Sequence, residues 1–478
     1  MRARRLALSI LFAVAIFAQA PADLKFPPLA PVRIPRIERF TLANGLRVFL
    51  LENHELPLVN GLALVRTGNL FDPPAKVGLA TLTGMVMRTG GTRARTGDQL
   101  DEDLENIAAE VESDIAESSG EVKFSALSDN TDAVLSVFHD VLTEPEFRQE
   151  RIDLAKSQLR DQIARRNDDP EAIAAREFAG LVYGKGTPYG CQIEYSTLAR
   201  IQREDLVAFY KRYFFPANIM LAVYGDFSAP AMKARIEKLF GGWDYRQASV
   251  PQFPAVEDVP HPGVYLATKE DVNQTVFAVG QLGGVLRDPN APALEIMADV
   301  LGGGFSSRLF KLVRTSLGYA YGIGAGWDAA YDHPGLFAIS GSTKSATTTE
   351  TLEVVRQEVE RIRTSEVTAE ELETAKQSSL NSFVFHFDSP HKTLSRVLRY
   401  QYYGYPEDFV FEYQKALAAV TPADVLSVAK KYLHSDAFTT VAIGNPKAFG
   451  QPLGALGAKV QPLDLTIPPP AEGGQSAR

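Results

Sequence analysis

The stretch MADVLGGGFSSRLFKLVRTSLGYAYGI, residues 297–323, is the most patterned part of the chain. An apolar helical run ends in three consecutive glycines, Gly302 to Gly304, and a second helical run follows them. Gly318 then opens an aromatic segment that is typical of a strand. The stretch predicts a helix, a glycine break, a second helix and a strand, in that order.

A tandem duplication surrounds this stretch. Residues 198–225, LARIQREDLVAFYKRYFFPANIMLAVYG, align without gaps onto residues 417–444, LAAVTPADVLSVAKKYLHSDAFTTVAIG, at a constant offset of 219. Upstream identities extend the match at an offset of 220: Glu150, Ala155 and Lys156 against Glu370, Ala375 and Lys376. Each copy holds strands, then helices, then a closing strand. The expected fold class is therefore α+β, with two tandem homologous domains, each a mostly antiparallel sheet packed with helices.

Shorter patterns predict the elements of the first copy. An Asn-Gly turn between two strand-like runs at residues 40–50 indicates a hairpin, and residues 58–65 continue as another strand. Asp168-Asp169-Pro170 closes one helix and opens the next. Further helices are expected at residues 78–87, 99–111, 131–142 and 149–166, and a strand at residues 121–127.

The N-terminal residues have the pattern of an export signal. Its basic start, its apolar run from Leu6 to Phe17 and the small residues Ala18 and Ala20 predict a secretory signal peptide that is cleaved after one of these two alanines. The alternative is a retained anchor, although the run is shorter than the roughly 20 residues of a spanning helix. We expect an exported protein, periplasmic or extracellular, with no stable membrane span after signal removal.

Composition shifts divide the rest of the chain. Proline clusters follow the signal and separate the two copies, and the C-terminal residues are rich in Pro, Gly and Ala. The expected organisation is a signal peptide at 1–20, a proline-rich leader at 21–35, a first domain at 36–245, a linker at 246–262, a second domain at 263–450 and a flexible tail at 451–478.

The net charge argues against nucleic-acid binding, and the single cysteine excludes an intrachain disulfide. A formal net charge of -9 argues against a nucleic-acid partner, because phosphate binding needs a basic face. Cys191 is the only cysteine, so no intrachain disulfide can form, and we interpret it as a packed small side chain.

No complete catalytic set emerges from the residues alone. The seven histidines include no pair at the i, i+4 spacing that lets two imidazoles on a helix reach one zinc ion. A GxSxG nucleophile motif is also missing from the sequence.

The duplication, the 297–323 signature, the Asp-Asp-Pro motif and the Thr-Pro-Tyr-Gly loop at 187–190 together resemble the pitrilysin/insulinase family of zinc peptidases, the inverzincins. The resemblance covers residues 36–450. It implies a zinc motif H-x-x-E-H in a phrase like G-L-A-H-F-L-E-H-M, and a glutamate on a helix about 75 residues later. Here Thr81 stands at the first histidine, Gly84 at the glutamate, Met85 at the second histidine and Gln162 at the distal glutamate. We therefore expect no cofactor bound by this chain.

The second half keeps a different motif of the same family, an arginine and tyrosine pair. Family members place an arginine and a tyrosine seven residues apart, in a phrase like L-R-E-K-x-G-L-A-Y, where they help to hold the substrate and the developing oxyanion. Arg314 and Tyr321 keep that spacing. Alternatively, Arg314 complements a helix dipole and Tyr321 is an ordinary strand aromatic.

The resemblance implies two functions. In the first, the chain is the non-catalytic, substrate-binding subunit of an exported heterodimeric zinc metallopeptidase, and Arg314 and Tyr321 act on the zinc site of a paralogous partner that degrades peptides. In the second, it is a catalytically inert structural or peptide-binding protein. A third reading, an active peptidase with an unrecognised metal site, conflicts with the histidine spacings.

Overall fold

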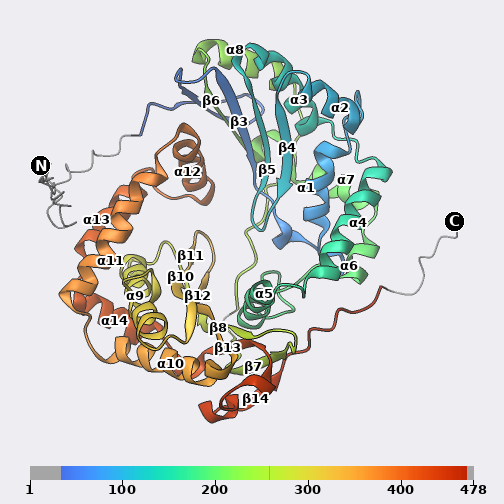
Figure 1. Ribbon diagram of the computed structural model, residues 1–478. Helices are drawn as coiled ribbons and strands as arrows, with labels where there is room; N and C mark the ends of the chain where they lie inside the picture. Colours follow the sequence, from blue (N-terminus) through green and yellow to red (C-terminus); the bar gives the residue numbers. More distant parts are fainter. Residues whose placement is uncertain (1–33, 258, 471–478) are drawn as a thin grey trace, which may run out of the picture. The chain divides into compact units, whose positions relative to one another are not determined.

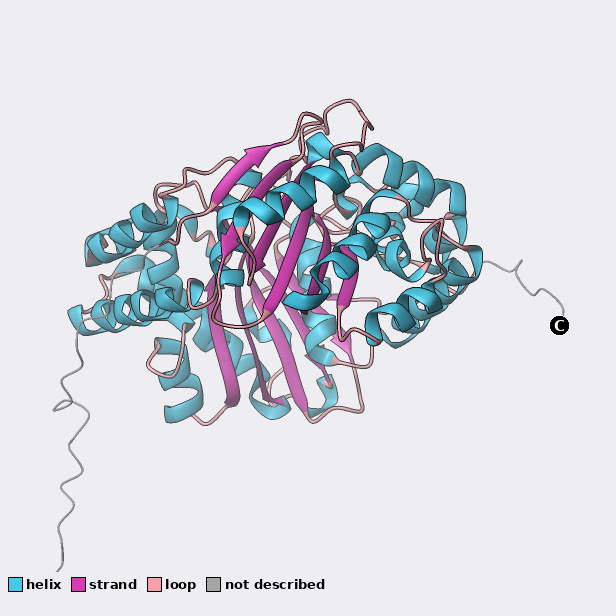
Figure 2. Cartoon of the chain, turned by 90° about the horizontal axis from the view of Figure 1, so that it is seen from above, coloured by secondary structure: helices cyan, strands magenta, loops and turns pink. Residues whose placement is uncertain are grey.

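Two six-stranded sheets organise the protein (Figure 1). The computed structural model describes residues 34–257 and 259–470, and Pro35 begins the compact unit to which both sheets belong. The expected signal peptide and nearly all of the leader lie outside the described residues. Helices flank the strands (Figure 2), and no helix in the described ranges is long and apolar enough to cross a membrane.

The first sheet has the strand order β1-β2-β6-β3-β5-β4. Its strands are β1 (Glu38–Thr41), β2 (Arg47–Glu52), β3 (Leu58–Val65), β4 (Glu110–Ile115), β5 (Gly120–Leu127) and β6 (Ile219–Gly225). Only β2 and β6 pair in parallel. The hairpin at residues 40–50 is confirmed, because β1 and β2 pair antiparallel across the Asn-Gly turn.

The second sheet has the strand order β10-β12-β8-β13-β7-β14 and repeats the first sheet over five strands. The sixth strand differs, because β14 ends the chain and pairs parallel with β7, whereas β1 begins it and pairs antiparallel with β2. Its strands are β7 (Gly263–Thr268), β8 (Gln274–Leu282), β10 (Ala320–Trp327), β12 (Leu336–Lys344), β13 (Thr439–Gly444) and β14 (Val460–Pro462). The parallel pair β2·β6 corresponds to β7·β13, and the edge strand β4 corresponds to β10. The two short strands β9 (Gly284–Val285) and β11 (Ala329–Ala330) pair separately.

The described residues of the first half form eight α-helices: α1 (Leu79–Thr89), α2 (Gly97–Glu105), α3 (Thr131–Thr143), α4 (Gln149–Arg165), α5 (Pro170–Tyr183), α6 (Tyr195–Arg200), α7 (Arg203–Tyr213) and α8 (Ala229–Phe240). The second half has α9 (Ala291–Gly302), α10 (Thr348–Thr364), α11 (Ala369–Ser382), α12 (Pro390–Tyr403), α13 (Phe409–Ala419) and α14 (Pro422–Tyr432). The expected α+β fold class is confirmed.

The repeat read from the sequence is structural. The aligned segments form α7 followed by β6 in one half and α14 followed by β13 in the other. The lysines at matching positions both donate to main-chain carbonyls, Lys156 to Ile201 and Lys376 to Ala418 over 2.8 Å, although the two carbonyls are not at equivalent positions of the repeat.

One helix of each half packs on the sheet of the other half. Alternate residues of the central strands face opposite sides, so Val48 packs in the main first-half core, whereas Phe49 packs with Leu398 of α12. In the second sheet Phe277 belongs to the main second-half core, and its neighbours pack against Phe178 of α5. Because α5 and α12 occupy corresponding places in the repeat, the two halves interlock symmetrically.

Two expectations are wrong. The acidic helix expected at residues 99–111 ends at Glu105, and the following residues form the edge strand β4. Its buried residues Val111 and Ile115 are four apart, a spacing that fits both a helix face and a strand face. The flexible tail expected from residue 451 is ordered where it pairs as β14 with β7, because the buried Leu453 and Leu456 anchor the segment that leads to it.

Candidate functional site

The expected pattern of the signature is confirmed. Helix α9 ends at Gly302, a helical turn resumes after the glycine break and has a wide π-helical segment from Phe310 to Ser316, and β10 follows. Wide helical turns of this kind are frequent at functional sites.

Arg314 and Tyr321 come together. The Arg314 guanidinium carbon lies 4.7 Å from the centroid of the Tyr321 ring and 4.8 Å from the centroid of the Phe310 ring, so the cation contacts two aromatic rings. Phe310 in turn packs edge-on against Phe305, with ring centroids 4.9 Å apart. Sequence reasoning missed the two phenylalanines, which precede Arg314 in the same signature.

The backbone aims Tyr321 outward. In the pairing of β10 with β12, Ala320 faces Thr343 and Gly322 faces Ser342, so Tyr321 is the extra residue of a β-bulge. Its side chain is 79% exposed, and β10 is an edge strand of its sheet. Bulges at sheet edges often redirect a side chain next to a site.

The two arginines of the signature have different surroundings. Arg308 is buried and donates through Nε and Nη2 to both carboxylate oxygens of Glu371, over 2.7 and 2.8 Å. This pair holds the pKa of Glu371 down at about 2. Half-buried Arg314 has no hydrogen-bond or carboxylate partner among the described residues. Arg308 is therefore structural, and the donors of Arg314 are available to a ligand.

The positions that the resemblance assigns to zinc lie on α1 and α4. Thr81 and Met85 are half-buried, one turn apart on α1, and Gln162 is exposed on α4. A hydroxyl, a thioether and an amide are poor zinc ligands beside imidazole and carboxylate. No group of three His, Cys, Asp or Glu side chains in the described ranges is placed to hold a metal ion.

Backbone fills the place of the missing general base. At Gly84, an added Cβ would lie 2.4 Å from the Ile115 nitrogen and 2.9 Å from the Asp114 carbonyl carbon of β4. Ser113 of the same strand donates to the Gly84 carbonyl over 2.7 Å. A glutamate at this position would need β4 to move. Together with the poor ligands at the other predicted zinc positions, this means that the residues present do not fit a zinc ion.

A half-buried carboxylate lies within the signature. Asp299 of α9 accepts a hydrogen bond of 2.7 Å from Ser379, yet burial raises its pKa to about 6. An aspartate in the unfolded chain titrates near pH ~4, so the folded state binds the proton more tightly. The folded state therefore loses stability as the pH rises: the destabilisation by ionised Asp299 is absent below about pH 4 and complete above about pH 6.

We expect Asp299→Asn to be more stable than the parent chain by about 1 kcal/mol above pH 6, because the amide removes the half-buried charge and still accepts from Ser379. The gain is expected to vanish at about pH 4. Urea unfolding of both proteins at the two pH values measures it. Asp244→Asn, at an exposed position, is the matched control. An equal gain at both pH values would contradict the assignment.

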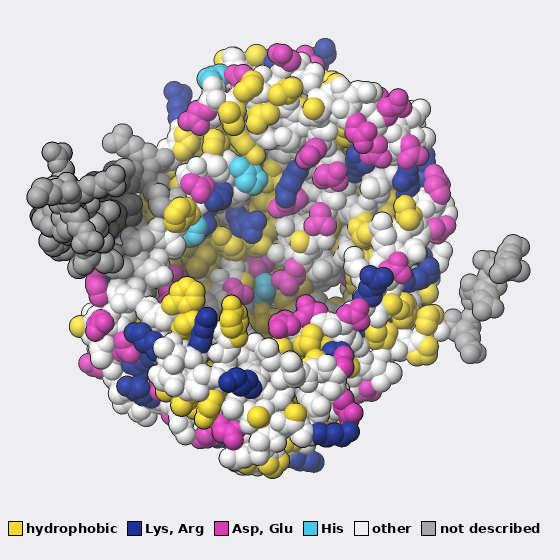
Figure 3. Space-filling model, viewed as in Figure 1, with side chains coloured by type: hydrophobic (Ala, Val, Ile, Leu, Met, Phe, Trp, Pro, Cys, Tyr) yellow, Lys and Arg dark blue, Asp and Glu magenta, His cyan; other side chains and the backbone are white. Residues whose placement is uncertain are grey.

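Charged side chains of both signs lie on the visible face of the molecule. On the described part of the face in Figure 3, basic and acidic side chains are interspersed, and no continuous basic area forms there. A phosphate-binding surface needs such an area.

Comparison with known proteins gives the family. Residues 47–185 match the family described as Insulinase (Peptidase family M16), and residues 200–379 match the one described as Peptidase M16 inactive domain. An uncharacterized zinc protease of Rickettsia bellii is 24% identical over 414 residues, which cover 84% of this chain and 96% of the relative. The mitochondrial-processing peptidase subunit alpha of Solanum tuberosum is 24% identical over 442 residues, covering 86% and 83%.

Solved structures agree in fold. A Pseudomonas fluorescens structure described as a peptidase M16 inactive domain has a TM-score of 0.77 at 22% identity and covers 87% of this chain and all of its own. A Helicobacter pylori protease has a TM-score of 0.75 at 17% identity. From the paired family matches, the tandem sheets and the signature, the chain belongs to the insulinase family, peptidase family M16.

Proposed function

We propose that the chain is the non-catalytic, substrate-binding subunit of an exported heterodimeric zinc metallopeptidase that degrades peptides. The partner is a paralogous chain that carries H-x-x-E-H and the zinc ion. Arg314 and Tyr321 of this chain face that zinc site and stabilise the charge that grows on the carbonyl oxygen during hydrolysis.

The observation that carries this proposal is the contrast between the two halves. The zinc positions hold Thr81, Gly84, Met85 and Gln162, and β4 backbone occupies the space of the general base. The Arg314 and Tyr321 pair is intact, in mutual contact, and available for a ligand.

The exposed edge of the second sheet suits an extended peptide. Strand β10 carries Tyr321 and is an edge strand. An extended peptide adds to such an edge through main-chain hydrogen bonds, so unfolded peptides are the expected substrate class.

Purification of the tagged chain from its native host tests the partnership. We expect a partner with H-x-x-E-H in a one-to-one complex, identified by mass spectrometry, and a reading frame for it next to this one. Recovery of the chain in a complex without peptidase activity would favour the alternative of an inert structural or peptide-binding subunit, to which the inactive-domain match also corresponds.

A further inference from the structure

Phe310 is the second aromatic contact of Arg314, and it precedes Arg314 by about one turn of the same helical segment. Its ring centroid lies 4.8 Å from the guanidinium carbon. Side chains four residues apart on a helix lie on the same side of it, so this contact forms within the segment itself. Tyr321, the other contact, comes from the neighbouring strand β10. Arg314 is therefore contacted both from its own segment and from the sheet.

The position of Phe310 is fixed by its neighbours. Leu309 and Val313, which lie before and after it in the sequence, are fully buried in the second-half core. Phe310 itself is half-buried, and the ring of Phe305 packs edge-on against it with ring centroids 4.9 Å apart. Tyr321, in contrast, is 79% exposed. Of the two rings that contact Arg314, the Phe310 ring is therefore the more firmly held.

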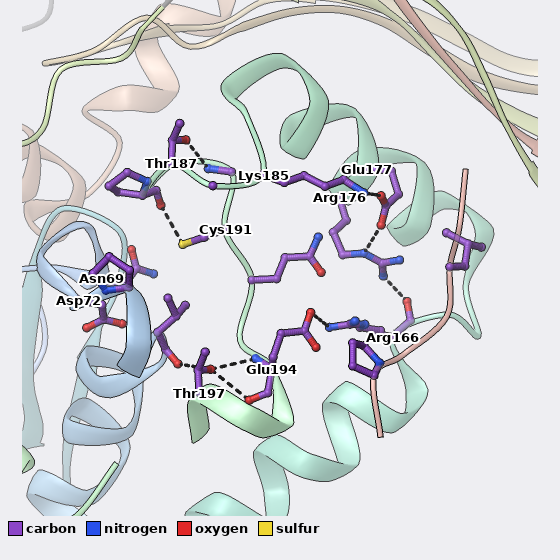
Figure 4. Close-up of a pocket in the computed structure, with 18 of the residues that line it drawn as sticks. Asn69, Asp72, Arg166, Arg176, Glu177, Lys185, Thr187, Cys191, Glu194 and Thr197 are labelled. Carbon is purple, nitrogen blue, oxygen red and sulfur yellow. Dashed lines mark hydrogen bonds and ion pairs between the residues drawn. The ribbon is translucent and has the colours of Figure 1, made fainter. Parts of the chain in front are cut away.

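Arginines elsewhere in the chain are held by carboxylates, as Arg308 is. Two of them line a cavity of about 410 Å³ beside α5 and α6 (Figure 4). There Arg166 Nη1 lies 2.9 Å from Glu194 Oε1, and Arg176 Nε lies 3.1 Å from Glu177 Oε1. A carboxylate fixes a guanidinium, but it occupies N–H donors and neutralises the positive charge. An arginine held in this way has less to offer to a developing oxyanion.

An aromatic ring fixes a guanidinium without these losses. The ring attracts the cation through its quadrupole, so no N–H donor is consumed and the charge is kept. Arg314 has two such aromatic contacts and no hydrogen-bond or carboxylate partner in the described ranges. All of its N–H donors therefore remain for a ligand while its side chain is held in place.

We infer that Phe310 is a positioning residue, which holds the Arg314 guanidinium where negative charge grows on the carbonyl oxygen. The inference rests on the proposed function for what Arg314 does, and on the contacts of Phe310 for how that side chain is held. A free arginine side chain samples many rotamers, and a side chain fixed before the reaction loses less entropy in the transition state. Phe310 acts through Arg314 and forms no bond to the reacting atoms.

Nuclear magnetic resonance of the full, isolated chain with labelled arginine tests the positioning without a partner. A proton above an aromatic ring resonates upfield, so we expect the Arg314 Nε–H signal, assigned by its loss in Arg314→Lys, upfield of those of exposed arginines. Phe310→Leu and Phe310→Met keep an apolar side chain without a ring and are expected to move the signal toward the exposed arginines. Phe310→Tyr is expected to leave it in place. A parent signal among those of exposed arginines, or an unmoved signal in Phe310→Leu, would overturn the inference.

Kinetics of the native complex on a quenched peptide tests the same contact during hydrolysis. Phe310→Leu is expected to lower kcat about tenfold and to leave KM unchanged, because the misplaced donor serves the transition state. Phe310→Tyr keeps the ring and is expected to keep kcat. In an Arg314→Ala background, Phe310→Leu is expected to cause no further loss, since Phe310 acts through Arg314. Additive losses in the double variant would contradict this role.

Phe385→Leu is the matched control for the loss of a ring. Phe385 is 62% exposed, and within the described part of the chain its ring neither pairs with another ring nor lies under a cation. This variant is expected to keep both kcat and the Arg314 signal. Failure of the inference differs from failure of the proposed function. Unchanged kcat in Arg314→Ala contradicts the proposed function, whereas lowered kcat in Arg314→Ala with unchanged kcat in Phe310→Leu contradicts only the role of Phe310.

Discussion

Arg314→Ala is expected to lower kcat of the reconstituted peptidase by about 100-fold or more, because loss of one preorganised donor to an oxyanion typically costs about 10²- to 10³-fold. The guanidinium already contacts Phe310 and Tyr321 and has free donors in the described structure, so little reorganisation is needed at the moment of reaction. The measurement is kcat and KM for a quenched peptide on the purified complex of this chain with its zinc-bearing partner.

Three further variants define the role of the pair. Arg314→Lys keeps the charge but loses the planar fork, so only partial rescue is expected. Tyr321→Phe keeps the ring that stacks on Arg314 and removes the phenol, and should also lower kcat. Lys311→Ala removes an exposed cation from the same helix and should leave kcat unchanged. Unchanged kcat in Arg314→Ala, with the complex intact, would support the inert alternative.

Gly84→Ala is expected to destabilise the fold by about 2 to 3 kcal/mol, the range found for overpacking in tight interiors. The added Cβ would lie 2.4 Å from the Ile115 nitrogen, and backbone cannot rotate away as a side-chain tip can. Urea unfolding measures the change. Gly242→Ala is the matched control, because an added Cβ there meets nothing within 4 Å.

Equal stability of the two glycine variants would mean that β4 yields easily and that Gly84 does not exclude a glutamate. The corresponding contact in the other half is equally close: at Gly302, an added Cβ would lie 2.1 Å from the Ala325 nitrogen of β10. Strands β4 and β10 are therefore each packed on one face against a helix that carries a glycine at the crossing.

Local sequence patterns and the internal repeat predict most of the fold. The Asn-Gly turn predicted the β1 and β2 hairpin, and Asp169 does cap α5 by accepting from the Glu171 and Ala172 amides. The constant offset between the two copies predicted matching topology, which holds for five of the six strands of each sheet. These features depend on residues close in sequence or on identity between copies, and both are readable without a structure.

Long-range packing could not be read in the same way. Helices α5 and α12 have ordinary amphipathic sequences, and nothing in them tells which sheet they cover. The tail was expected to be flexible from its Pro, Gly and Ala content, but Leu463, Leu465 and Ile467 alternate in it and pack on the cores. An alternation of this kind was the available signal.

The candidate site shows the same difference between local features, which the sequence predicts, and long-range features, which it does not. The spacing of Arg314 and Tyr321 was visible in the sequence, and the structure brings the two side chains into contact; their catalytic role stays a prediction. The β-bulge at Tyr321, the occupied space beside Gly84 and the cavity beside Glu194 all depend on contacts between distant segments. Such contacts leave no local pattern.

The central claim is that this chain completes a zinc site that it does not contain. Zinc content and peptide hydrolysis, measured side by side on the isolated chain and on its native complex, test it most directly. We expect the isolated chain to bind no stoichiometric zinc and to cleave no peptide, and the complex to hold one zinc ion per heterodimer with hydrolysis abolished by a chelator. Stoichiometric zinc and full, chelator-sensitive activity in the isolated chain would contradict the account.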